Sequence, residues 1–189
     1  MPHFRKLIGD HCYLAPTSTE DAALWAKWDA DLEVAIPMGD EAHRIITVEK
    51  ERETLGMIAE KRLPEFMIVL NDGDVPIGRC MLMEVDMVNR TATLGLTIGE
   101  KEHWNRGYGL EATHLLLEYA FHLLNLHSVM LGVYSFNKRA IRCYQKAGFK
   151  EIGRRREARR FGPKAYDMIL MDILAGEFPS RRVARLIEQ

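Results

Sequence analysis

Two glycines separated by one residue stand at the start of a long apolar helical pattern. They lie in the segment Trp104-Asn-Arg-Gly-Tyr-Gly-Leu-Glu-Ala112. Glycine has no Cβ, so the backbone at Gly107 and Gly109 can turn tightly and a ligand can approach it closely. The first turn of a helix also has backbone N–H groups without intrahelical partners and a partial positive charge. The segment therefore predicts a pyrophosphate site, with a tight turn that binds nothing as the alternative.

The same loop argues against two common phosphate ligands. It lacks the Lys-Ser/Thr pair of a Walker loop, which holds the terminal phosphates of ATP. It also lacks the full G-x-G-x-x-G pattern with a following acidic residue that binds the ribose of NAD. We therefore expect a pyrophosphate that belongs to neither ATP nor NAD.

A second polar pair follows the next predicted strand, within residues 133–149. Asn137 can cap the helix that follows it, and Tyr144 lies nearly two helical turns further along. Both side chains then project from one face of that helix, roughly 10 Å apart. This spacing suits an extended ligand, whereas the alternative is a capping Asn and a Tyr that packs into the core.

Hydrophobic periodicity and turn signals predict the helices and strands that carry these residues. A helix is expected to begin at Thr17 as N-cap, with Glu20 completing a capping box, and Trp25 and Trp28 are expected to pack in the core. The other predicted helices are 47–63, 107–124 and 137–147. The predicted strands are 11–15, 66–70, 75–85, 91–98, 128–134, 150–156 and 165–174. Strands mixed with helices in this order predict an α/β fold with a mixed sheet.

Composition limits the classes of protein that remain. The chain has 189 residues, of which 47% are apolar, enough for one sizeable core. Its net charge of −1 argues against direct nucleic-acid binding, so the arginines between 154 and 160 are interpreted as a solvated strand edge. Three scattered cysteines predict neither a disulfide framework nor a metal site. No secretory signal or membrane span is visible, so we expect a cytoplasmic protein.

The two motifs together resemble the GNAT superfamily of acyl-coenzyme A-dependent N-acetyltransferases, in its RimJ/RimL-like branch. The resemblance rests on W-N-R-G-Y-G-L-E-A at 104–112 and N-x-x-A-x-x-x-Y-x-K-x-G-F at 137–149. It implies one domain over 1–189, with a core at about 11–175 and a charged tail at 176–189. It also implies a mostly antiparallel sheet of six to seven strands that is splayed at its centre, with helices on both faces.

The resemblance assigns most of the binding residues to the coenzyme A part of acetyl-CoA. The strand end that would pair with the pantetheine arm is Leu96, Thr97 and Ile98. The pyrophosphate would be held by the loop residues Asn105, Arg106, Gly107, Tyr108, Gly109 and Leu110. Asn137 would hydrogen-bond the pantetheine, Ala140 would leave room for it, and Tyr144 would place its hydroxyl beside the thioester sulfur. No metal is implied.

The expected reaction is direct attack of a neutral amine on the thioester carbonyl. The backbone N–H of Ile98 would stabilise the oxyanion, and Tyr144 would protonate the leaving thiolate, since an unperturbed tyrosine has a pKa of about 10. Many relatives carry Glu where this chain has Thr93, which cannot act as a base. Glu84 is the substitute carboxylate that we consider, His103 is interpreted as a solvated residue, and a water chain without a protein base is the alternative.

The acceptor is less clearly encoded. The stretch 31–44 would border it, with carboxylates that attract a cationic amine or belong to an ordinary loop: Glu33, Asp40 and Glu41, with His43 beside them. The first hypothesis is a protein N-terminus or a ribosome-associated protein as acceptor. The alternatives are a small amine, such as a polyamine, an amino-acid derivative or an antibiotic, or a non-catalytic acyl-CoA sensor. A monomer or homodimer is expected.

Overall fold

The computed structural model describes residues 3–179 and 182–187. The chain divides into two compact units: Met1–Met81 with Leu96–Ala112, and Leu82–Gly95 with Thr113–Gln189. The first unit is named the N-terminal unit and the second the C-terminal unit. Residues 180–181 and 188–189, which include Arg181 and are part of the expected charged tail, lie outside the described residues.

Within the described residues, eight strands form a mixed, mostly antiparallel sheet in the order β1-β2-β3-β4-β5-β6-β8-β7. Their bounds are Leu7–Ile8 (β1), Cys12–Pro16 (β2), Glu65–Leu70 (β3), Pro76–Asp86 (β4), Thr91–Ile98 (β5), Ser128–Tyr134 (β6), Lys150–Phe161 (β7) and Lys164–Leu174 (β8). The α/β class predicted from the sequence is confirmed. The extra strand is β1, in which Leu7 pairs with Leu14, because two residues are too short to show a period.

Strands β5 and β6 are parallel and pair only over part of their length. The pairs run from Thr91 with Ser128 to Thr93 with Met130, whereas β5 continues to Ile98 and β6 to Tyr134. All other pairings with a described register are antiparallel. The described register between β5 and β6 therefore ends at Thr93.

Helices α1 (Ala22–Ala30), α2 (Leu32–Ala35) and α3 (Val48–Lys61) belong to the N-terminal unit. The predicted cap at Thr17 is wrong by one residue. Ser18 is the N-cap, with its Oγ accepting from the N–H of Glu20 at 3.2 Å and its own N–H donating to Asp21 at 2.8 Å. The carboxylate of Asp21 makes the capping box, so a short 3-10 turn at Thr19–Asp21 precedes α1.

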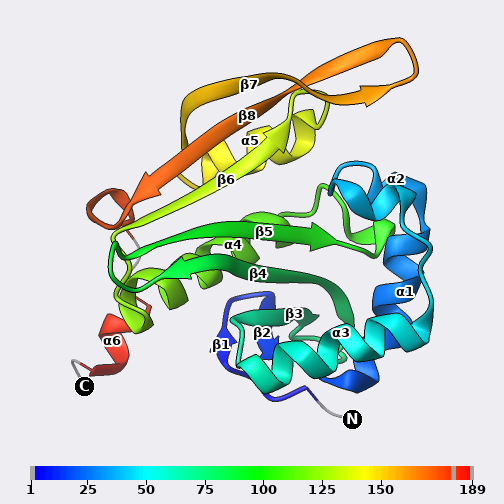
Figure 1. Ribbon diagram of the computed structural model, residues 1–189. Helices are drawn as coiled ribbons and strands as arrows, with labels where there is room; N and C mark the ends of the chain where they lie inside the picture. Colours follow the sequence, from blue (N-terminus) through cyan, green and yellow to red (C-terminus); the bar gives the residue numbers. More distant parts are fainter. Residues whose placement is uncertain (1–2, 180–181, 188–189) are drawn as a thin grey trace. The chain divides into compact units, whose positions relative to one another are not determined.

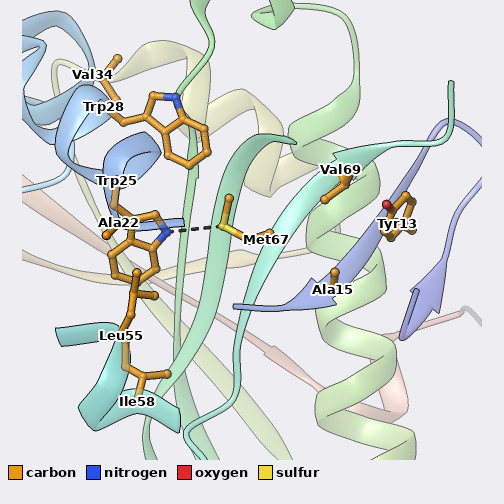
Figure 2. Packing of buried hydrophobic residues seen from close by; sticks show 10 residues of the cluster. All are labelled: Tyr13, Ala15, Ala22, Trp25, Trp28, Val34, Leu55, Ile58, Met67 and Val69. Atoms are coloured by element: carbon orange, nitrogen blue, oxygen red, sulfur yellow. Dashed lines mark hydrogen bonds between the residues drawn. The ribbon is translucent and has the colours of Figure 1, made fainter. Parts of the chain in front are cut away.

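The core of the N-terminal unit lies where α1 and α3 meet strands β2 and β3. Figure 2 shows Trp25 and Trp28 on α1, with Leu55 and Ile58 on α3. Both tryptophans are buried, and the indole N–H of Trp25 donates to the sulfur of Met67 at 3.4 Å. The prediction that the two tryptophans pack in the core is confirmed.

The C-terminal unit contains most of α4 (Tyr108–Glu118), a π-helical turn at Tyr119–Leu123, α5 (Lys138–Lys146) and α6 (Ala184–Ile187). Strand β8 lies between β6 and β7, and β7 and β8 form a long hairpin (Figure 1). Strand β7 extends to Phe161, five residues beyond the predicted 156. None of the described helices is long and apolar enough to cross a membrane.

Candidate functional site

The glycine loop in the N-terminal unit has the geometry that its sequence predicts. Asn105 has φ +61° and Gly107 has φ +90°, both in the left-handed region. Helix α4 begins at Tyr108, and its first regular bond runs from the N–H of Glu111 to the carbonyl of Gly107 at 3.1 Å. The amides of Tyr108, Gly109 and Leu110 therefore lie in the first turn of a helix, where an anion is stabilised.

Charge at this loop also suits an anion. Residues Asn105, Arg106 and Gly107 are exposed, and no described residue forms an ion pair with Arg106. His103 is not the solvated residue that we expected. It is partly buried, and its ring lies edge to face against Tyr108 with 5.6 Å between the ring centroids.

Glu111 is a site residue that the sequence analysis did not assign. Its carboxylate accepts from the N–H of Asp10 and from the N–H of His11 at 3.0 Å. A Cβ on Gly9 would overlap this carboxylate and also the backbone carbonyl oxygen of Cys12, so a glycine is needed there. The first turn of α4 is thus fixed to the turn between β1 and β2, a long-range contact without a local sequence signal.

The end of β5, Leu96 to Ile98, lies close to β4 within the same unit. A Cβ on Gly78 of β4 would overlap the carbonyl oxygen of Thr97. The indole N–H of Trp104 donates to the carbonyl of Ile98 at 2.7 Å. This bond connects Trp104, at the start of the glycine loop, to the end of β5. The strand end and the loop therefore lie next to each other.

In the C-terminal unit, α5 carries the second motif as predicted. The Oδ1 of Asn137 accepts from the N–H of Ala140 at 3.1 Å and caps the helix. This leaves the side-chain NH₂ of Asn137 as the group that it can offer a ligand. Tyr144 lies further along α5, is 7% exposed, and contacts Phe149 edge to face at 5.8 Å between centroids. The alternative interpretation is a capping Asn with a Tyr in the core. It agrees with the cap that Asn137 forms and with the burial of Tyr144.

The structure brings together Glu84 and Thr93, the two residues that bear on the missing base. The hydroxyl of Thr93 donates to the Oε2 of Glu84 at 3.1 Å. Glu84 is exposed and has φ +51°, a left-handed conformation within strand β4 that a non-glycine residue rarely adopts. The carboxylate of Glu84 therefore lies within hydrogen-bond distance of the Thr93 side chain.

The acidic stretch after α1 is less open to a cationic ligand than the sequence suggests. Asp31 and Glu33 both bind the ammonium of Lys101, at 2.7 Å and 2.5 Å. These two carboxylates, Asp31 first, raise the pKa of Lys101 above its ordinary value. His43 is exposed, whereas the side chains of Asp40 and Glu41 lie outside the described part of the chain. Within the described part, no three His, Cys, Asp or Glu side chains gather as metal ligands.

Comparison with known proteins places this geometry in a family. Residues 11–150 match the model of the acetyltransferase (GNAT) domain. The chain is 26% identical over 176 residues to the uncharacterized N-acetyltransferase p20 of Bacillus licheniformis, covering 91% of this chain and 97% of that protein. It is 30% identical over 105 residues to a spermidine N(1)-acetyltransferase of Vibrio cholerae, covering 56% of this chain and 60% of the relative.

Solved structures share the fold. A spermidine N-acetyltransferase from Vibrio cholerae in complex with CoA and spermine superposes with a TM-score of 0.80 at 22% identity, over 91% of this chain and all of that chain. A GNAT-family acetyltransferase from Bacillus anthracis gives 0.77 at 18% identity, over 90% and 99%. With a family model that matches most of its length, the chain belongs to the GNAT family of acetyltransferases, and it is an acyltransferase.

Proposed function

We propose that this acyltransferase moves the acetyl group of acetyl-CoA to the primary amine of a protein N-terminus in the cytoplasm, as a RimJ/RimL-like enzyme. We take 1–189 as one acetyltransferase domain. The observation that supports the donor is the loop before α4, where Gly107 at φ +90° precedes the first turn of a helix, the place where an anion is stabilised. Arg106 adds a cation for the phosphates, so these residues fit coenzyme A.

The residues expected to hold the rest of the donor lie on two short segments. The strand end 96–98 would pair with the pantetheine through its backbone, since the described pairing of β5 with β6 ends at Thr93. Asn137 would donate its side-chain NH₂, because its oxygen already caps α5. Acetyl-CoA supplies the activated thioester when it is bound.

Three groups of this chain would move or stabilise charge during transfer. Glu84 accepts a proton from the incoming amine, since it is the carboxylate bonded to Thr93. The backbone N–H of Ile98 stabilises negative charge on the acyl oxygen. The hydroxyl of Tyr144 gives its proton to the departing sulfur.

The pairing of Lys101 with Asp31 and Glu33 supports an acceptor with one amine. A polyamine is recognised by carboxylates that its several ammonium groups can reach. Here both carboxylates already bind the ammonium of Lys101, so part of their negative charge is compensated within the chain. A peptide needs only one neutral amine at the reacting end, so this arrangement does not hinder it.

A polyamine acceptor is the second candidate. It is favoured by the match to a spermidine N(1)-acetyltransferase at 30% identity over 105 residues. A closed acidic pocket would suit it, whereas an open cleft would suit a peptide. The two candidates predict opposite rankings of substrates in one assay.

The test is release of coenzyme A measured against peptides with free N-termini, spermidine, spermine, amino-acid amides and an aminoglycoside. Peptides are expected to give a kcat/KM at least about tenfold above that of the polyamines, and the reverse ranking selects the second candidate. Tyr144→Phe is expected to lower kcat by about 100-fold or more, because it removes the general acid.

Calorimetry with acetyl-CoA at low salt provides the second measurement. Tyr144→Phe should bind acetyl-CoA nearly as well as the unmodified chain, and Tyr166→Phe on β8 serves as the matched control with unchanged kcat. Full activity of Tyr144→Phe would refute the role of Tyr144. Binding of acetyl-CoA without turnover of any amine would select the sensor, and absence of binding would refute the donor.

A further inference from the structure

The turn between β5 and the glycine loop is bonded to α1 and α2 by two adjacent residues of opposite charge. The carboxylate of Glu100 accepts from the ammonium of Lys27 at 2.6 Å and 2.8 Å and from the indole N–H of Trp28 at 2.9 Å. Both partners lie on α1. The next residue, Lys101, binds Asp31 and Glu33 at α2. Glu100 and Lys101 with these four partners are named the loop clamp.

The Glu100 half of the clamp is largely buried. Its side chain is 14% exposed, and Trp28 is 1% exposed. Burial raises the pKa of Glu100, but the hydrogen bonds from Lys27 and Trp28 outweigh this effect, so the pKa lies below its ordinary value. Glu100 is therefore ionised at neutral pH and binds its partners as a charged acceptor.

The Lys101 half also organises α2. Asp31 caps this helix by accepting from the N–H of Glu33 at 3.0 Å. The pKa of Asp31 is lowered, first by its hydrogen bond with Lys101 and further by this backbone bond. Lys101 thus joins the cap of α2 to the chain that leads into the glycine loop.

Only a few backbone residues separate the loop clamp from the glycine loop, and their hydrogen bonds fix their conformation. The N–H groups of Gly99 and Glu100 both donate to the carbonyl of Ile77, at 2.8 Å and 3.1 Å. A Cβ on Gly99 would overlap the indole of Trp28, so the backbone lies directly against that ring. A 3-10 turn at Lys101–His103 follows, and the N–H of Trp104 donates to the carbonyl of Lys101 at 3.1 Å. Asn105 and Gly107, with their left-handed φ, come next.

We propose that Glu100 and Lys101 are positioning residues for the pyrophosphate loop of this enzyme. They hold the turn that starts the loop against α1 and α2, and this orients the amides at the start of α4 before the donor binds. The proposal rests on acetyl-CoA as donor. Neither residue needs to contact the donor. Replacing them therefore lowers the affinity for acetyl-CoA and leaves the rate of the transfer step unchanged.

The test uses steady-state kinetics with acetyl-CoA as the varied substrate. Lys101→Met is expected to raise the KM for acetyl-CoA by about three- to tenfold with kcat within about twofold, since a partly exposed ion pair has a modest effect. Glu100→Gln is expected to act in the same direction. Lys50→Met on α3, which breaks the exposed pair with Glu53, is the matched control with an unchanged KM.

Charge reversal distinguishes positioning from a general loss of structure. Lys101→Glu repels Asp31 and Glu33, so it should raise the KM for acetyl-CoA more than Lys101→Met does. Adding Glu33→Lys should return the KM to within about twofold of the unmodified enzyme, because the pair is restored with its charges exchanged. A purely structural lesion would not be reversed in this way.

Two results would overturn the proposal: a KM for acetyl-CoA that Lys101→Glu leaves unchanged, or a raised KM that Glu33→Lys does not reverse. Thermal unfolding of each variant shows whether it is folded, and Lys101→Met replaces Lys101→Glu if the latter unfolds. If the unmodified chain itself failed to bind acetyl-CoA, the proposed donor would be refuted as well. Binding and turnover by the unmodified chain with an unaffected Lys101→Glu would refute the clamp alone.

Discussion

A left-handed backbone within a strand marks Glu84 as an unusual residue. Its φ of +51° costs about 1–3 kcal/mol for a non-glycine side chain. Such strain persists where the surrounding structure or a function requires it. The carboxylate so placed accepts from Thr93 at 3.1 Å. From the sequence, Thr93 occupies the expected acidic position and Glu84 is the substitute carboxylate, and a hydrogen bond connects the two in the structure.

Glu84→Gln keeps the shape of the side chain and removes the base. We expect kcat to fall by about 100-fold with a KM for acetyl-CoA close to that of the unmodified enzyme, because proton removal by a side chain contributes to the rate. Glu157→Gln on β7 is the matched control, since Glu157 is also exposed with φ +50°. An unchanged kcat in steady-state assays would leave water as the base.

At the scale of elements, the start of α4 depends on one backbone conformation. A Cβ on Gly107 would meet nothing within 4 Å, so space is not what requires glycine. The requirement is φ +90°, where an L-residue is strained by about 1–2 kcal/mol. A side chain at this position would shift the loop away from the conformation in which its backbone N–H groups face the pyrophosphate.

Gly107→Ala is therefore expected to weaken acetyl-CoA binding by about tenfold, measured by calorimetry at low salt. Gly162→Ala in the turn between β7 and β8 is the matched control. Gly162 also has a left-handed φ, +56°, and free space around it. It should lose similar stability without a change in affinity, and equal losses of affinity in both variants would contradict the role of the loop.

Elements with local signals were predicted well, and those without them were not. The bounds of β5 and β6 match the predicted ranges, because alternating apolar residues mark them. Strand β7 was predicted five residues too short, since its exposed arginines show no apolar period. Its continuation is fixed by pairing with β8, where Arg160 pairs with Ala165 and Phe161 with Lys164. Helix α2 is too short to give a period.

For the whole molecule, stability depends on buried ionisable side chains in the N-terminal unit: Arg79, Asp29 and Glu65. Arg79 on β4 binds both oxygens of Asp29 on α1, at 2.8 Å and 2.9 Å, and stacks on Trp25 at 4.0 Å. Glu65 on β3 is 8% exposed. Burial raises its pKa to about 7, with Arg79 opposing the shift and Asp29 and Glu51 adding to it.

This raised pKa predicts a pH-dependent stability. A folded-state pKa above the unfolded value means that the native state binds more protons between about pH 4.5 and about 7. The free energy of unfolding therefore falls as pH rises through this window, by roughly 3 kcal/mol at most. Glu65→Gln has no such carboxyl and should show a flatter profile.

Urea unfolding of the unmodified chain and of Glu65→Gln from pH 4.5 to 8 measures this difference. The variant should gain stability relative to the unmodified chain as pH rises. Glu53→Gln on the exposed face of α3 is the control and should follow the unmodified profile. Parallel profiles for Glu65→Gln and the unmodified chain would contradict the prediction.

The glycine loop, the cap at Asn137 and most strands can be predicted from the amino-acid sequence. These features depend on a φ value, a capping bond or a period, and each involves residues only a few positions apart. The tertiary structure alone decided that Lys101 binds Glu33, 68 positions away, and that burial raises the pKa of Glu65. Such contacts depend on how distant segments pack, and no local pattern of residues records that.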